Sequence, residues 1–241
     1  MNHYFITGTS RGIGKAIAEK LLEREDNFVI GISRNCSIKH ERYEHYSVDL
    51  SDGKQVLEWK FPLLFKAKKI ALINNAGILG EVRHAGRMES EDIAATIQVN
   101  LTAPTVFTNA FLKTYHDHQA QQIIINVSSG AGKNPIDGWN VYCATKAALD
   151  MYTRVVADEI RIGERPNTFI FSVAPGVVDT YMQEYIRGSQ LSEFSQVQRF
   201  LNMKNDDQLA DPVLVAGKYC TILESPEKFT ETLFSVKDIG Q

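Results

Sequence analysis

The chain reads Thr7-Gly8-Thr9-Ser10-Arg11-Gly12-Ile13-Gly14 where a short apolar run gives way to an amphipathic segment. Residues 3–7 are typical of a β-strand, and residues 12–24 carry apolar side chains at helical spacing. Glycines in such a turn permit positive φ angles and close approach of the backbone to a bound group. The helix that follows offers free N–H groups and a positive dipole end to an anion. The turn therefore predicts a pyrophosphate site formed by Gly8, Ser10, Arg11, Gly12, Ile13 and Gly14.

The spacing of these glycines is GxxxGxG, which differs from the GxGxxG fingerprint of many dinucleotide sites. A tight connection from strand to helix, without any ligand, is the alternative interpretation. The position of the turn, after the first strand and before an amphipathic helix, favours the binding interpretation.

Short β-like runs alternate with longer helical patterns along the rest of the chain. We expect strands at 28–32, 46–48, 70–74, 122–127, 168–173 and 233–236, and helices at 56–65, 90–114, 139–162 and 211–223. Pro104 predicts a kink or a break within 90–114. Repeated strand–helix units predict an α/β fold, a Rossmann-like doubly wound parallel sheet of about seven strands flanked by helices. Residues 1–241 are expected to form a single NAD(P)-binding domain of this kind.

The composition is that of an ordinary globular domain, with 241 residues, 44% hydrophobic and 23% charged. The net charge of -3 does not favour nucleic acid or an anionic membrane as a partner. No segment approaches the ~20 apolar residues of a membrane helix, and the first residues lack the features of a signal peptide. Three cysteines without CxxC spacing indicate reduced thiols, so we expect a cytoplasmic protein. His116 and His118 are a weak metal signal, and no metal is expected.

The residues after the second strand bear on the choice of cofactor. An acidic residue there would bind the ribose 2′-OH of NAD, but the chain has Ser33-Arg34. Ser33 can donate a hydrogen bond, and the planar fork of Arg34 suits a 2′-phosphate. Arg11 is a second candidate for that phosphate. The pattern favours NADPH/NADP⁺ over NADH, and an ordinary exposed loop arginine is the alternative interpretation of Arg34.

Polar and glycine residues follow several of the expected strands. Because the carboxyl ends of parallel strands meet at one edge of the sheet, these residues are expected to share that edge with the glycine turn. Tyr142 and Lys146 are four residues apart, so they share one face of a helix. Asn100 lies mid-helix, where asparagine is a poor helix former. The residues that follow strands are Asn74-Asn75-Ala76-Gly77, Ser128-Ser129 and Pro175-Gly176-Val177-Val178-Asp179-Thr180.

Taken together, these segments resemble the short-chain dehydrogenase/reductase family over nearly the whole chain. The resemblance implies a catalytic tetrad of Asn100, Ser129, Tyr142 and Lys146. Ser129 is preferred to Ser128 because it stands 13 residues before Tyr142, the usual separation in the family. The resemblance also implies further cofactor contacts from Asp49, Leu50, Asn75, Ala76, Gly77, Tyr142, Lys146, Pro175, Gly176, Val178 and Thr180.

The resemblance implies that Tyr142 donates a proton while a carbonyl carbon receives hydride. Tyrosine ordinarily titrates near pKa ~10, and an ammonium group about 4 Å away is expected to lower that pKa by about three units. Ser129 is implied to bind the substrate oxygen, an oxyanion-stabilising role. By the same resemblance Lys146 also holds the nicotinamide ribose, and Asn100 anchors a water for proton relay.

Two segments, residues 125–151 and 174–183, are similar to bacterial benzil reductases and more distantly to sepiapterin reductases. This implies an aromatic or vicinal diketone such as benzil as substrate, with a pterin side-chain ketone as the alternative. Trp139 and Met182 are candidates for substrate contact beside Ser129 and Tyr142, in a substrate-loop region at about 178–208. Packing in the core is the alternative for Trp139, and also for Tyr181, Met182 and Tyr185. The aspartate expected for pterin binding has no clear counterpart, since only Asp238 is near.

Two other functions remain open, alcohol oxidation with NADP⁺ and an NADP-sensing binding protein on the same fold. The retention of all four tetrad residues favours an enzyme of the carbonyl-reducing type. Helix 139–162 spreads apolar residues around its circumference, which predicts pairing with 90–114 across a two-fold axis. A homodimer or homotetramer is therefore expected.

Overall fold

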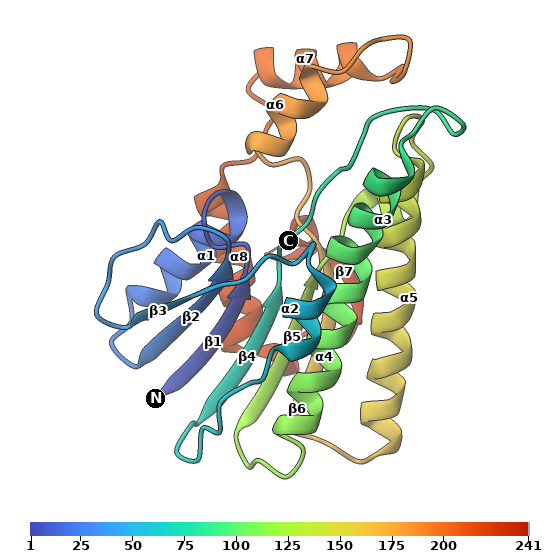
Figure 1. The fold of residues 1–241 in the computed structure, drawn as a ribbon. Helices are drawn as coiled ribbons and strands as arrows, with labels where there is room; N and C mark the ends of the chain where they lie inside the picture. Colours follow the sequence, from blue (N-terminus) through green and yellow to red (C-terminus); the bar gives the residue numbers. More distant parts are fainter. Residues whose placement is uncertain (241) are drawn as a thin grey trace.

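The computed structural model describes residues 1–240, which form a parallel sheet with helices on both faces (Figure 1). Within these residues the sheet has seven strands in the order β3-β2-β1-β4-β5-β6-β7. The direction of strand order reverses between β1 and β4, which is where doubly wound folds bind ligands. The predicted fold class is confirmed. The strands are β1 (Asn2–Thr7), β2 (Asn27–Ser33), β3 (Tyr43–Ser47), β4 (Lys69–Asn74), β5 (Gln121–Val127), β6 (Thr168–Ala174) and β7 (Leu233–Ser235).

Two apolar clusters hold the helices against the sheet. One face is covered by α1 (Gly12–Leu22) and α8 (Pro212–Glu224), which bury residues such as Ile17 and Tyr219. The other face is covered by α2 (Gly53–Glu58), α4 (Ala103–Thr114) and α5 (Asn140–Ile162), with Phe107 and Val156 in their cluster. Because both faces are covered, the central strands are almost entirely buried and read as continuous apolar runs.

The long helical region is continuous through Pro104. It consists of α3 (Ser90–Ile97), a π-helical turn (Gln98–Thr102) and α4. Pro104 lies in the first turn of α4, where its missing N–H is tolerated. Of the predicted kink or break at Pro104, the break is therefore wrong. The irregularity instead lies just before it, in the π turn that contains Asn100.

The bounds of the helix predicted at 56–65 are wrong, because α2 starts at Gly53, ends at Glu58, and the backbone turns extended at Trp59. Asp52 caps the start of α2 by accepting hydrogen bonds from two backbone N–H groups. Trp59 then stacks on Phe107 at 5.7 Å, and Phe61 packs edge-on against Phe5. Burial of these rings against the sheet outweighs the local helical pattern.

Residues 178–208, which we call the cover, rise above the carboxyl edge of the sheet (Figure 1). The cover contains α6 (Tyr181–Arg187) and α7 (Val197–Asn205). Its tip is tied to neighbouring loops, since Glu193 pairs with Arg87 at 2.8 Å and Asp137 accepts two hydrogen bonds from Ser195. Among residues 1–240, no helix has the length and apolar content needed to span a membrane.

Candidate active site

The glycine turn packs closely against the residues at the end of β4. Gly8 and Gly12 have φ angles of 75° and 58°, in the left-handed region that favours glycine. A Cβ at Gly14 would lie only 2.5 Å from the Gly8 carbonyl oxygen and 2.3 Å from Asn75 Nδ2. Asn75 Nδ2 also donates to the Thr7 carbonyl at 2.9 Å, which joins the two strand ends. The close packing leaves this turn no room for larger residues.

The first turn of α1 is open to an anion. Its N-cap residue, Arg11, is extended and makes no side-chain cap, and the first turn holds no acidic residue. The backbone N–H groups of this turn therefore keep their capacity to bind a phosphate. The guanidinium of Arg11 lies 4.1 Å from the ring centroid of Tyr181, the first residue of α6. Arg11 thus joins the glycine turn to the cover, a contact that sequence reasoning missed.

Ser33 and Arg34, at the end of β2, differ in whether their side chains already have partners in the protein. The Ser33 hydroxyl donates to the Asn35 carbonyl at 3.0 Å and lies 3.2 Å from His45 Nε2, inside the protein. Arg34 is exposed, and its guanidinium makes no ion pair within residues 1–240. Hydrogen bonds from Ser51, aided by the Arg34 charge, hold the pKa of the Asp49 carboxyl below its usual value. Of these residues, Arg34 has the side chain most free to meet a phosphate.

Asn100 is fully buried in the π turn and pins the chain after β4. Its Oδ1 accepts a hydrogen bond from the Ile78 N–H at 2.9 Å, and its Nδ2 donates to the Ile78 carbonyl at 2.7 Å. A Cβ at Gly77 would lie 3.3 Å from Asn100 Oδ1 and 3.6 Å from Lys146 Nζ. The structure therefore brings Asn100, Gly77 and Lys146 together, from three different segments.

Lys146 is buried, and its Nζ donates a hydrogen bond of 2.8 Å to the Val127 carbonyl at the end of β5. Burial lowers the pKa of Lys146 to about 8, although the Asp150 carboxylate opposes this shift. Asp150 in turn accepts a hydrogen bond from the Ser172 hydroxyl at 2.5 Å. Lys146 is thus a buried cation on helix α5, and its ammonium group is held by the Val127 carbonyl.

Tyr142 is buried beside Ser129. Burial raises the pKa of Tyr142 to about 12, and a hydrogen bond with Ser129 acts in the opposite direction. Lys146 Nζ is 5.7 Å from the Tyr142 ring centroid and is engaged with Val127. The expectation that Lys146 lowers the pKa of Tyr142 toward neutrality is wrong for this structure, because desolvation of the phenol dominates. Tyr142 therefore holds its proton at neutral pH.

An aromatic cluster closes the site from above. Trp139, at the entry of α5, stacks on Phe194 with centroids 5.2 Å apart, and meets Phe200 at 5.6 Å. Its ring stands edge-on to Tyr142 at 5.8 Å. Met182 packs against the same cluster. Trp139 is thus both a packing residue and a direct neighbour of Tyr142, so its two interpretations are compatible.

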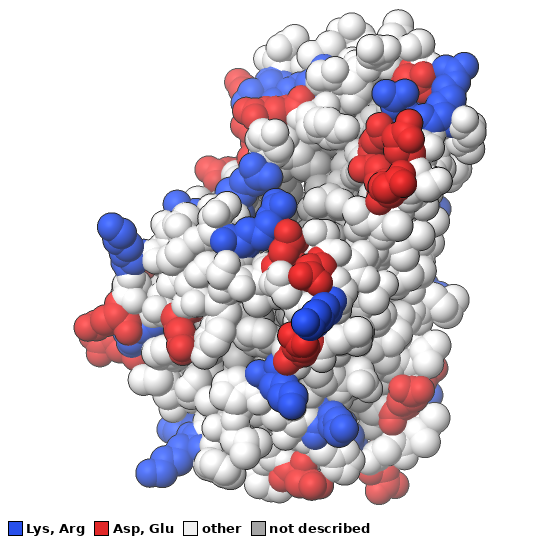
Figure 2. Space-filling model, viewed as in Figure 1, with Lys and Arg blue, Asp and Glu red and all other residues white. Residues whose placement is uncertain are grey.

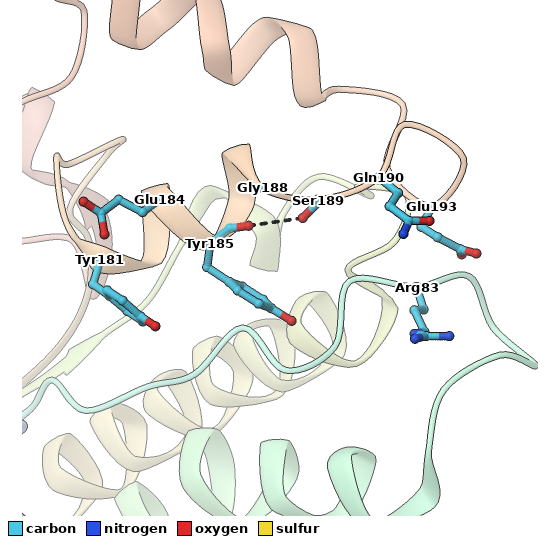
Figure 3. A pocket seen from close by; sticks show the side chains of 8 residues that line it. All are labelled: Arg83, Tyr181, Glu184, Tyr185, Gly188, Ser189, Gln190 and Glu193. Atoms are coloured by element: carbon cyan, nitrogen blue, oxygen red, sulfur yellow. Dashed lines mark hydrogen bonds between the residues drawn. The ribbon is translucent and has the colours of Figure 1, made fainter.

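The opposite side of α6 lines a pocket of about 470 Å³ (Figure 3). Tyr181 and Tyr185 are 57% and 47% exposed and reach down from α6 toward the loop that carries Arg83. The alternative that these tyrosines face the core is therefore wrong. Sequence reasoning missed Arg83 and Glu193, which also line the pocket, because only folding brings these distant segments together.

The charged side chains on the face drawn in Figure 2 are of mixed sign. Figure 2 shows acidic and basic side chains interspersed on the viewed face, without a continuous basic surface. This agrees with the net charge of -3.

The family model for short chain dehydrogenases matches residues 2–190. The chain belongs to this family. It is 39% identical over 241 residues to a benzil reductase ((S)-benzoin forming) of Bacillus cereus, covering 94% of this chain and 96% of that protein. The corresponding protein of Bacillus subtilis is 35% identical, with 99% of each chain covered. A sepiapterin reductase of Mus musculus is 30% identical, covering 91% of this chain and 90% of that one.

Among solved structures, a short chain dehydrogenase/reductase from Saccharomyces cerevisiae superposes with a TM-score of 0.85 at 24% identity, covering 99% and 97% of the two chains. That likeness concerns the fold. The family and the benzil reductase relatives make this short-chain dehydrogenase/reductase an oxidoreductase of the hydroxyl–carbonyl couple.

A nicotinamide dinucleotide is the cofactor that the family implies, and the residues present fit it. The open first turn of α1 provides backbone donors for phosphate, and the left-handed Gly8 and Gly12 let the backbone approach closely. Gly77 leaves space beside Asn100 and Lys146. These features lie along one edge of the sheet, as a long ligand requires.

Proposed function

We propose that this chain is an NADPH-dependent carbonyl reductase that reduces an aromatic or vicinal diketone such as benzil, with Tyr142 as the proton donor. The observation that carries this proposal is a buried Tyr142 that lies beside Ser129 and Lys146, beneath an aromatic cluster. The cofactor, when bound, supplies the hydride. Reduction needs a phenol that carries its proton, and the raised pKa keeps Tyr142 protonated at neutral pH until charge develops on the substrate oxygen.

The four polar residues have separate roles in this proposal. Ser129 Oγ and Tyr142 Oη bind the substrate oxygen, and Tyr142 gives up its proton as charge develops there. Lys146 supplies a positive charge near the resulting phenolate and holds the nicotinamide ribose. Asn100 keeps the residues after β4 in place through Ile78. Met182 and Trp139 form the wall of the substrate site on the side of the cover.

The remaining cofactor contacts follow the edge of the sheet. Gly8, Ser10, Arg11, Gly12, Ile13 and Gly14 hold the pyrophosphate. Asp49 and Leu50 lie next to the adenine. Ser33 and Arg34 bind the adenosine ribose and its 2′-phosphate. Asn75, Ala76, Gly77, Pro175, Gly176, Val178 and Thr180 line the way to the nicotinamide.

Replacing Arg34 by alanine is expected to raise the Kd for NADPH about 10-fold or more while changing the Kd for NADH less than about 2-fold. The reason is that only NADPH carries the 2′-phosphate that the guanidinium would bind. Lys39→Ala, which removes an exposed positive charge from the same loop, is the matched control. Fluorescence titration of both cofactors measures the effect. Equal weakening of the two cofactors would contradict the assignment.

The aromatic character of the cover supports a bulky aromatic ketone, because Trp139, Phe194 and Phe200 lie next to Tyr142. The benzil reductase relatives support the same substrate class. A pterin substrate is less favoured by this chain. Asp238 accepts a hydrogen bond from the Ser235 N–H at 2.8 Å in a capping box, so its carboxylate already serves the fold.

Consumption of NADPH by the purified protein with benzil, other 1,2-diketones and sepiapterin tests the proposal. Turnover of benzil with little turnover of sepiapterin is expected. Preference for sepiapterin would favour the pterin alternative. Tight NADPH binding without turnover of any ketone would contradict carbonyl reduction of this class and favour the NADP-sensing alternative. Faster oxidation of the corresponding alcohols with NADP⁺ would favour the oxidative direction.

Helix α5 leaves an apolar face uncovered in the single chain, with Met151 at 57% and Val155 at 48% exposed. We propose that this face pairs with its copy and with the α3–α4 region across a two-fold axis, in a homodimer or homotetramer. Light scattering at micromolar concentration is expected to give at least twice the mass of one chain. A monomer there would contradict the proposal. The cytoplasmic location stays a prediction.

A further inference from the structure

The indole N–H of Trp139 is buried and has no hydrogen-bond partner within residues 1–240. Trp139 as a whole is only 6% exposed. A buried donor without an acceptor destabilises a protein, so such groups are rare and call for an explanation. The indole group can only donate, so the missing partner must be an acceptor such as an oxygen.

The ring that carries this donor lies beside the proposed proton donor. Trp139 stands edge-on to Tyr142, with centroids 5.8 Å apart, and Ser129 neighbours the Tyr142 hydroxyl. Trp139 precedes α5, which is packed on the sheet, whereas its stacking partners Phe194 and Phe200 belong to the cover. Movement of the cover would therefore uncover the indole next to the reacting groups without displacing Trp139 itself.

We propose that Trp139 Nε1–H donates a hydrogen bond to the second oxygen of a vicinal dicarbonyl substrate, on the carbon next to the carbonyl that is reduced. Ser129 and Tyr142 bind the reacting oxygen, and Trp139 binds its neighbour. The inference rests on the proposed function and narrows it, because it makes the second oxygen a specificity requirement. A monoketone of the same shape leaves the indole without an acceptor.

The kinetic test compares benzil with benzyl phenyl ketone, which keeps both phenyl rings and replaces one carbonyl by a methylene group. Trp139→Phe keeps an aromatic ring in the cluster and removes the donor. We expect the ratio of kcat/KM for benzil to that for the monoketone to fall about 5- to 10-fold, as the loss of one net hydrogen bond implies. An equal fall for both ketones, or no fall for benzil, would overturn the proposal.

Trp59 provides a matched control, because its indole N–H is also buried and unpartnered but lies in the cluster of Phe61 and Phe107. Trp59→Phe should leave the ratio of kcat/KM for the two ketones unchanged. Thermal melts of both variants show whether the folded fraction is comparable. A change in the ratio with Trp59→Phe as large as with Trp139→Phe would overturn the specific role of Trp139.

A binding measurement separates this inference from the proposed function. The chain has two tryptophans, so its two indole N–H signals can be assigned by NMR with the two variants. With NADP⁺ present, so that no reduction occurs, benzil should shift the Trp139 signal downfield and the monoketone should not. Such a shift without turnover under NADPH would uphold the contact and refute the reductase. Turnover of benzil without the shift would overturn the contact alone.

Discussion

Replacing Tyr142 by phenylalanine is expected to lower kcat for ketone reduction about 10³-fold, the size of effect typical of a lost general acid. The change removes one hydroxyl from a ring that is already buried, and the cluster of Trp139 and Met182 around it remains. Burial raises the pKa of the phenol to about 12, further above the neutral range than the ordinary value of about 10, so the wild-type enzyme carries the proton at pH 7. Steady-state kinetics with a diketone at pH 7 measure the loss.

Tyr152→Phe is the matched control. Tyr152 lies on the same helix, burial likewise raises its pKa to about 12, and its hydroxyl donates to the Thr105 carbonyl at 3.3 Å, away from Ser129 and Lys146. Its loss should change kcat less than about 2-fold. The Kd for NADPH should stay near the wild-type value in Tyr142→Phe. Retained turnover in that variant would contradict the assigned donor and reopen the search among the other groups at this edge of the sheet.

The second large effect concerns Lys146, where activity and stability should move in opposite directions. Lys146→Met is expected to abolish measurable reduction, since it removes the cation beside Tyr142. It should also stabilise the fold at pH 7. Burial holds the pKa of Lys146 at about 8 rather than 10.5, a shift worth about 3 kcal/mol of destabilisation when the group is charged. The Val127 carbonyl loses its hydrogen-bond donor, which offsets part of this effect. We therefore expect the free energy of unfolding to rise by about 2 kcal/mol.

The sign of this effect depends on pH. Between pH 8 and 10.5 the unfolded chain binds more protons at Lys146 than the folded one, so the stability of the wild type rises with pH across this window. The destabilisation is fully present below pH 8 and absent above 10.5. The advantage of Lys146→Met in urea unfolding should therefore shrink from pH 7 to pH 10. Lys113→Met, at an exposed position on α4, should show neither the gain nor the pH dependence. A constant difference at both pH values would contradict a buried cation.

The pattern of the chain was enough to predict the sheet and the place where its polar residues meet. Strands covered on both faces read as apolar runs, and the glycine turn, Asn75 and Ser129 all follow such runs. Because parallel strands end at one edge, their order along the chain implied a common site. The i, i+4 spacing of Tyr142 and Lys146 likewise needs only helical geometry.

Other properties depend on contacts between segments that are distant in sequence. The pKa of Tyr142 follows from its burial beneath the cover, and no local pattern reports that burial. Phe194 meets Trp139, and Glu193 meets Arg87, only because the cover folds back over the sheet. The early end of α2 has the same origin, since Trp59 and Phe61 find buried partners that outweigh helical spacing. Local periodicity therefore determined the elements and their polar ends, while desolvation and long-range packing determined the raised pKa of Tyr142, the position of the cover and the unpaired indole N–H of Trp139.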